Sequence, residues 1–147
     1  MTANAPAPVP PSQKSFVLLK PDTVRRGLVG EVLSRFEAKG LKIVAMDLRQ
    51  VDGDLADQHY AEHVDKAFYP PLRTFVTSGP SVALLVEGDE AIEVVRAING
   101  ATDGRKAAPG TIRGDLSLSN RENLVHGSDS PESAAREIAL WFPHLAD

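Results

Sequence analysis

Two kinds of hydrophobic pattern alternate along the chain. Short runs of apolar residues are typical of buried strands, whereas apolar residues that recur every three to four positions are typical of amphipathic helices. Strands are predicted at 16–19, 41–51, 81–86 and 124–125. Leu28, Val32 and Phe36 share one face of a helix that Gly40 ends, and further helices are predicted over 90–98 and from Pro131 onward.

The order strand, helix, strand, strand, helix, strand is typical of a ferredoxin-like α+β sandwich, in which helices cover one face of a four-stranded antiparallel sheet. Two additions to this βαββαβ core are predicted. Two short helices around 56–63 and 71–77 form a helical insertion after the second strand, and a long loop at 102–109 precedes the last strand. Such a loop in a compact domain indicates a functional or intersubunit segment.

The length of 147 residues fits one domain, which we expect to span 14–147. Residues 1–13 hold four prolines and few bulky apolar groups, so we expect a flexible tail there. Acidic residues exceed basic ones by 20 to 16, which argues against duplex nucleic acid as a main partner. The chain has no cysteine, no apolar run of membrane-spanning length and no secretory signal pattern, so we expect a soluble, cytoplasmic protein.

The segment 123–133 delivers one histidine from a short strand into a polar turn. Gly127 lets the chain turn beside the His126 ring, and Ser130 before Pro131 is typical of a helix N-cap. A neutral imidazole is a good nucleophile near neutral pH, and amides at a helix start favour an anionic group. The segment therefore indicates phosphate chemistry on histidine, although a lone histidine in such a turn is more often an ordinary surface residue.

Side chains, rather than a glycine-rich loop, are expected to bind phosphate, because the chain lacks the Walker pattern. The candidates are Lys20 at the end of a strand, Arg96 on a helix and Arg113 in a turn, and the planar fork of arginine suits phosphate oxygens. Each of them taken alone is as well explained as a solvated or snorkelling side chain. They indicate a phosphate site only if the fold brings them together.

Glu137 lies beside the apolar face of the last helix, which Ala134, Ile138 and Trp141 define. A carboxylate at that position needs a partner, because burying an unpaired charge is costly. His126, at the start of the same unit, is a plausible partner, and a carboxylate that orients an imidazole determines which ring nitrogen is free to react. The alternative is an exposed helix glutamate.

The predicted helical insertion contains two further groups of interest. His59 and His63 lie four positions apart and could in principle share a metal ion, but no third ligand accompanies them. We therefore reject a metal site and expect a polar helix face near Glu62. Phe68 and Leu72 could form a flat apolar slot for a nucleotide base, or could equally be core of the insertion.

Three segments in order resemble the nucleoside diphosphate kinase family: 16–22, 108–115 and 123–142. The similarity runs from about Lys14 to Phe142 without an obvious gap. The resemblance implies a kinase that moves the γ-phosphoryl group of ATP or another nucleoside triphosphate to a nucleoside diphosphate, in a ping-pong mechanism through a phosphohistidine at His126. It also implies Mg²⁺ bound mainly by the nucleotide, and a homo-oligomer, either a tetramer or a hexamer built from dimers.

The resemblance also implies roles for individual residues. Glu137 and Ser128 would support His126, Tyr60 would complete the pocket around it, and Asp129 would reach Mg²⁺ through water. Lys20 would act both on the reacting phosphate and in nucleotide binding. The nucleotide-binding residues implied are Lys20, Phe68, Leu72, Arg96, Thr102, Arg113 and Asn123.

Two positions depart from the family pattern. Asn120 stands where an apolar residue is usual, so the opposite wall of the base slot is expected to be more polar. Gly104 stands where many relatives have proline, which bears on the rigidity of the long loop and on subunit contacts.

Two alternatives from other functional classes stay open. A nucleotide-binding regulatory or scaffold protein would keep the same fold and pocket but transfer nothing, and intact His126, Lys20 and Arg113 argue against it. A protein-directed histidine phosphotransfer role, or a nucleic-acid-binding side activity, has no specific sequence feature in its support.

Overall fold

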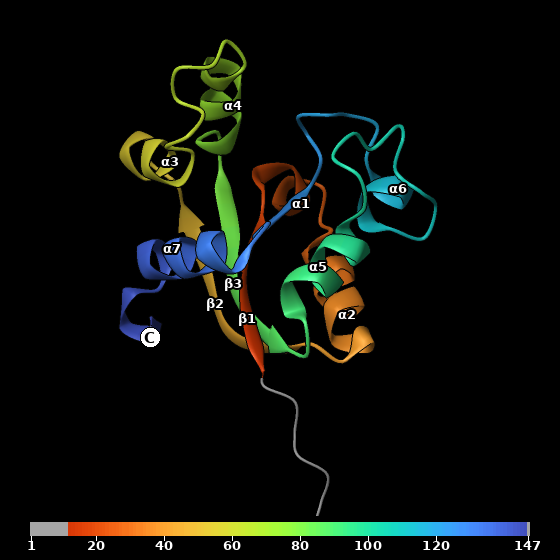
Figure 1. Ribbon diagram of the computed structural model, residues 1–147. Helices are drawn as coiled ribbons and strands as arrows, with labels where there is room; N and C mark the ends of the chain where they lie inside the picture. Colours follow the sequence, from red (N-terminus) through yellow and green to blue (C-terminus); the bar gives the residue numbers. More distant parts are fainter. Residues whose placement is uncertain (1–11, 147) are drawn as a thin grey trace, which may run out of the picture.

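The computed structural model describes residues 12–146 and has a four-stranded antiparallel sheet with strand order β2-β3-β1-β4 (Figure 1). The strands are β1 (Gln13–Leu19), β2 (Lys42–Gln50), β3 (Pro80–Gly88) and β4 (Val125–Gly127). The helices are α1 (Pro21–Arg25), α2 (Val29–Lys39), α3 (Gly53–His59), α4 (Tyr69–Val76), α5 (Ala91–Asn99), α6 (Ile112–Leu116), α7 (Pro131–Trp141) and the 3₁₀ turn η1 (Pro143–Leu145). This architecture confirms the predicted ferredoxin-like α+β class.

Strand β1 is central and is buried on both faces. Successive side chains of a strand point to opposite faces, so Phe16 and Leu18 pack in one hydrophobic cluster while Val17 and Leu19 pack in another. Helices α2 and α5 cover the second cluster, as expected from the sequence. Helix α7, together with the inserted α3 and α4, covers the first cluster (Figure 1). Both faces of the sheet therefore carry helices, and the expectation that helices cover one face was wrong, because the insertion and the last helix bury the other face.

Most predicted elements are present, with shifts at their ends. The expected first strand starts three residues earlier, at Gln13, so the folded part extends into the segment that we expected to be a tail. Residues 1–11 of that tail lie outside the described part of the chain. The helix expected over 56–63 is instead α3, which Asp52 begins as N-cap by accepting the N–H of Leu55 at 2.8 Å. Helices α1 and α6 have five residues each and were not predicted.

The long loop before β4 is held by its own hydrogen bonds. The backbone N–H of Gly104 donates to the carbonyl of Ser119 at 3.1 Å, and the Asp103 carboxylate binds the guanidinium of Arg105 at 2.9 Å. A Cβ atom at position 104 would lie 2.4 Å from the carbonyl oxygen of Ser117. Proline would remove the donor and add atoms where there is no room, so Gly104 suits the loop as it is built in this chain.

Helix α7 begins as the sequence predicted. The Ser130 hydroxyl accepts the backbone N–H of Ser133 at 3.1 Å, and Pro131 occupies the first helical position. This start determines where Glu137, two turns later, meets the sheet. No helix within residues 12–146 is both long and apolar enough to cross a membrane.

Replacing the cap of α7 tests how far its start stabilises the fold. We expect Ser130→Ala to lower the free energy of unfolding by about 1 kcal/mol, because one N–H at the helix start loses its partner. Chemical denaturation at fixed protein concentration measures this. Ser34→Ala, an exposed serine inside α2, is the matched control and should be neutral or slightly stabilising. Equal losses in both variants would contradict the assigned cap.

Candidate active site

His126 lies on β4 directly beside the central strand, where it pairs in register with Leu18. Its side chain is about a quarter exposed, at 23%, and lines the large open cleft between the α3–α4 insertion and the loop before β4. Gly127 lets the strand approach α5 closely, since a Cβ there would lie 2.8 Å from a methyl group of Val95. The predicted delivery of one histidine from a short strand into a polar site is therefore confirmed.

Leu124, two residues before His126, has a strained backbone. Its φ of 75° lies in the left-handed region, which costs a bulky residue on the order of 1–3 kcal/mol. Three bonds from the segment after β1 hold it: the Lys20 N–H and the Thr23 hydroxyl donate to its carbonyl at 2.8 and 2.6 Å, and its N–H donates to Asp22 at 3.0 Å. The strand expected at 124–125 therefore begins one residue later, as β4 at Val125–Gly127, and Asn123 is directed toward Lys20.

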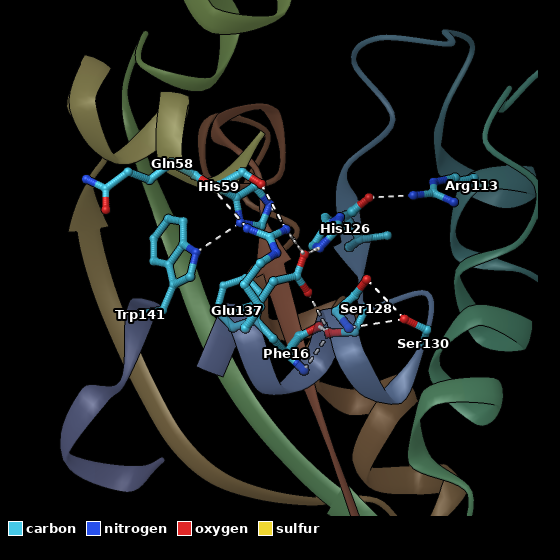
Figure 2. A network of polar contacts seen from close by, with 12 residues as sticks. Phe16, Gln58, His59, Arg113, His126, Ser128, Ser130, Glu137 and Trp141 are labelled. Carbon is cyan, nitrogen blue, oxygen red and sulfur yellow. Dashed lines mark hydrogen bonds and ion pairs between the residues drawn. The ribbon is translucent and has the colours of Figure 1, made fainter. Parts of the chain in front are cut away.

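Glu137 and Ser128 bind together behind His126 (Figure 2). One carboxylate oxygen of Glu137 lies 2.8 Å from Nε2 of His126, and the other accepts the Ser128 hydroxyl at 2.6 Å. Ser128 also accepts the backbone N–H of Phe16 at 3.1 Å, which ties the group to the central strand. Glu137 is only 3% exposed, so the alternative of an exposed helix glutamate is wrong and the predicted partnership with His126 is present.

The hydrogen bond to Glu137 determines the chemistry of the His126 ring. An ionised carboxylate only accepts hydrogen bonds, so Nε2 of a neutral His126 carries the proton. Nδ1 then has a free lone pair, which is what a nucleophilic imidazole needs. A positive charge that develops on the ring during attack at Nδ1 would lie 2.8 Å from the Glu137 carboxylate.

Lys20 and Arg113 lie close together in the cleft, and neighbouring positive charge lowers the pKa of each. Burial, followed by the charge of Arg113, lowers the pKa of Lys20 to about 8, although Asp22 opposes the shift. Burial and the charge of Arg96 lower the pKa of Arg113 to about 10. These cations, predicted from three separate elements, are therefore brought together, and an anion that binds between them would relieve their mutual repulsion.

Asn123 and Arg113 connect the cations to the strand that carries His126. Asn123 accepts the Lys20 ammonium at 2.8 Å and donates to the carbonyl of Thr102 at 2.9 Å. Arg113 donates to the carbonyls of Gly100, Asn123 and Val125 at 2.8, 3.2 and 2.5 Å (Figure 2 shows the last of these). Those bonds use three of its five N–H groups and leave two for a ligand. Thr102 and Arg96 also line the cleft, at its exposed rim.

The apolar candidates occupy one side of the cleft. Phe68 is half exposed, at 52%, so it is not core of the insertion, and Leu72 beside it is partly buried against the first cluster. Asn120 lines the cleft as well, and so does Leu118, which is 88% exposed and was missed from the sequence. Tyr60 lines the cleft deeper in, and burial together with the charge of Glu137 raises its pKa.

His59 is a site residue that our sequence interpretation dismissed. It is buried rather than on a polar helix face, and its ring stands edge to face against His126 with centroids 4.7 Å apart. Its spacing of four from Leu55 and three from Ala56, both buried, is the signal that could have revealed its orientation. His63, the other half of the rejected metal pair, is partly exposed near Phe68.

Asp129 lies at the exposed end of the cleft, near the start of α7. A hydrogen bond from Ser133 holds the pKa of its carboxyl below the usual value, and Arg96 contributes in the same direction. Among the cleft residues within 12–146, the carboxylates are Glu62, Asp129 and the buried Glu137. Such a scattered set does not make a protein-built cage for Mg²⁺, but it suits an ion that arrives on a ligand's phosphate oxygens.

Known proteins are similar to this chain in sequence and in fold. The sequence model of the nucleoside diphosphate kinase family matches residues 13–146. A nucleoside diphosphate kinase from a Nocardioides species is 74% identical over 134 residues, which are 91% of this chain and 99% of the relative. A nucleoside diphosphate kinase from Mycolicibacterium smegmatis is 61% identical over 133 residues, which are 90% of this chain and 96% of the relative.

A solved structure supports the same assignment. The halophilic nucleoside diphosphate kinase from Halobacterium salinarum in complex with CDP superposes with a TM-score of 0.87 at 49% identity, covering 89% of this chain and 88% of that one. Fold, cleft and relatives together define a nucleotide-binding phosphotransferase. The chain belongs to the nucleoside diphosphate kinase family, and it is a kinase of that specificity.

The depressed pKa of Lys20 predicts a pH dependence. The charged form of lysine is the protonated one, so Lys20 loses its charge as pH rises through about 8, below the range of an exposed lysine. We expect kcat/KM, which reports the free enzyme, to fall above that pH toward about a tenfold loss per pH unit. Steady-state rates from pH 6 to 10 measure this.

Lys20→Arg is the control for that profile. The variant keeps a cation that stays charged throughout, so its activity should be lower at pH 7 but should lose the alkaline decline. An unchanged decline in Lys20→Arg would show that another group titrates.

Proposed function

We propose that this kinase works by a ping-pong mechanism in which His126 accepts the γ-phosphoryl group of a nucleoside triphosphate and passes it to a nucleoside diphosphate. The observation that carries the proposal is the bond between Nε2 of His126 and Glu137 at 2.8 Å. It leaves Nδ1 of a cleft-facing imidazole free to attack. Glu137 is 3% exposed, and burying a carboxylate is costly unless its oxygens have partners, which here are His126 and Ser128.

The first half-reaction forms one bond and breaks one. The Nδ1 lone pair of His126 attacks the γ-phosphorus, the bond from that phosphorus to the bridging oxygen breaks, and the nucleoside diphosphate leaves with the electron pair. The ring, now bonded at Nδ1 and protonated at Nε2, carries positive charge beside Glu137. The second half-reaction is the reverse, with a terminal oxygen of another nucleoside diphosphate as the attacking group.

The cleft supplies what such a reaction needs, because phosphoryl transfer is catalysed chiefly by positioning and charge neutralisation. Buried Lys20 and partly buried Arg113 line the same cleft as His126 and would neutralise the transferring group, with Arg96 and Thr102 on the outer phosphates. Tyr60 has a buried hydroxyl without a partner among the described residues, and it would donate to a phosphate oxygen. Asn123 would keep Lys20 in place.

The base would lie against Phe68 and Leu72, with Asn120 on the opposite wall. Stacking on an aromatic face accepts every base, so broad nucleotide use is expected. Mg²⁺ bound with the nucleotide would supply further charge neutralisation, and Asp129 is the residue that would help to hold it, through water. Cytoplasmic location stays a prediction.

A nucleotide-binding regulatory protein, the alternative from another functional class, would not need the Glu137 bond to His126, and the family membership of the chain argues against it. A net charge of −4 argues against nucleic-acid binding.

We also propose that the chain forms a homo-oligomer, a tetramer or a hexamer of dimers. Strand β2 is an edge strand, and Met46 and Leu48 on one of its faces are 58% and 66% exposed. An unpaired strand edge with exposed apolar side chains favours pairing with a second copy.

Phosphoryl labelling tests the mechanism. We expect the protein incubated with Mg²⁺ and ATP labelled on its γ-phosphate to acquire an acid-labile, alkali-stable label. A chase with GDP should move that label to GTP. His126→Ala should acquire none, because its side chain offers no nucleophile.

His144→Ala is the matched control, since this histidine lies in η1 outside the cleft, and it should be labelled like the unaltered protein. Transfer of phosphate from ATP to GDP without any label on the unaltered chain would contradict a phosphohistidine intermediate.

A charge on β2 tests the oligomer. We expect Leu48→Lys to shift the protein to smaller species at micromolar concentration in analytical ultracentrifugation, because a lysine on a strand edge opposes pairing. Asp47→Asn, an exposed neighbour pointing to the other face, should leave assembly unchanged. Dissociation in both variants, or in neither, would contradict a β2 interface.

A further inference from the structure

A hydrogen bond beneath the site has no part in the proposed transfer itself. The indole Nε1 of Trp141 donates to Nδ1 of His59 at 3.0 Å, and both side chains are buried (Figure 2). An indole nitrogen can only donate a hydrogen bond. Nδ1 of His59 is therefore unprotonated, and the single proton of the neutral ring lies on Nε2.

The surroundings of His59 keep it neutral. Burial lowers its pKa well below the usual value, and the nearby His126 adds to the shift. Of the groups around it, Glu137 alone carries a carboxylate. The titratable and charged groups that face His59 are His126 on β4, Glu137 and Arg136 on α7, Lys20 after β1, and Tyr60 and His63 after α3.

Both histidines turn Nε2 toward the same carboxylate oxygen of Glu137. His126 reaches it at 2.8 Å and His59 stops at 3.9 Å. Nε2 of His59 is buried and has no hydrogen-bond partner among the described residues. His59 therefore lies just beyond hydrogen-bonding distance of Glu137, and His126 makes the hydrogen bond to that carboxylate oxygen.

We propose that the hydrogen bond from Trp141 holds His59 in the tautomer protonated at Nε2, and that this arrangement, the tautomer lock, keeps Glu137 bonded to His126. Both are positioning residues, and the proposal rests on His126 as the phosphoryl acceptor. The indole occupies the one lone pair of His59, so that ring has no free nitrogen to take up a proton or a phosphoryl group. A protonated His59 would attract Glu137 and draw it away from His126.

The lock also bears on a possible metal centre. His59, His126 and Glu137 each offer one ligand atom, and these atoms lie within 4.8 Å of one another. A metal ligand must present a lone pair, and Nε2 of His59 presents a hydrogen while Trp141 holds Nδ1. We therefore assign no metal to this cluster.

Nuclear magnetic resonance tests the lock without reference to activity. Long-range proton–nitrogen correlation spectra of the ¹⁵N-labelled full chain distinguish protonated from unprotonated ring nitrogens. We expect His59 at pH 7 to show a protonated Nε2 and an unprotonated Nδ1. A proton on Nδ1, or a cationic ring, would overturn the proposal while leaving the labelling of His126 untouched.

Trp141→Phe tests the consequence. Phenylalanine keeps most of the apolar volume but has no N–H, so Nδ1 of His59 becomes free to take up a proton. We expect kcat/KM of this variant to stay within about threefold of the unaltered enzyme at pH 8, and its decline on the acid side to begin at a higher pH than in the unaltered enzyme.

Two controls separate the lock from a packing effect. Phe142→Leu removes aromatic volume from the same core without touching the hydrogen bond, and its loss of kcat/KM should be equal at pH 6 and pH 8. In a His59→Gln background, where residue 59 cannot titrate, Trp141→Phe should no longer cause an additional acid-side loss. A pH-independent loss in Trp141→Phe, or an acid-side loss that persists in that background, would overturn the proposal.

Discussion

A single buried carboxylate organises this molecule. Glu137 is almost fully enclosed, and it links helix α7, strand β4 and, through Ser128, the central strand β1. Leaving a buried polar group without its hydrogen-bond partner costs about 1–3 kcal/mol, and more for a charged group, so the groups around Glu137 are strongly constrained. The orientation of the histidine ring, the start of α7 and the path of β4 all have to satisfy the same two oxygens.

The cleft stands in electrostatic contrast to that interior. Lys20 is buried and Arg113 is partly buried. The charge of Arg113 lowers the pKa of Lys20 and the charge of Arg96 lowers that of Arg113, so the cations of the cleft repel one another. A polyphosphate that enters would exchange this repulsion for attraction. The same arrangement explains why a chain with a net charge of −4 can still attract an anionic ligand: the local field and not the total charge decides.

Sequence patterns predicted the core elements, the helix cap at Ser130 and the partnership of Glu137 with His126, because each follows from local periodicity or from the cost of burial. The roles expected for Tyr60, Ser128 and Asn123 came from the family resemblance, because no local sequence pattern indicates them. The sequence did not reveal the two five-residue helices, which are too short for a periodic signal, and it did not reveal that the predicted helices α3, α4 and α7 cover the second face of the sheet. His59 was misjudged because its partners, Trp141 and His126, are distant in sequence and only the fold brings them near.

The strained Leu124 has a further consequence. Its carbonyl and N–H are held by residues that lie about a hundred positions earlier in the chain, and the same is true of the bond between Lys20 and Asn123. Contacts of such long sequence separation form slowly, after shorter loops have closed. A chain that is still being synthesised, or of which only the first half has folded, cannot assemble the cleft. Catalytic activity therefore shows that the chain has folded through its last strand, β4.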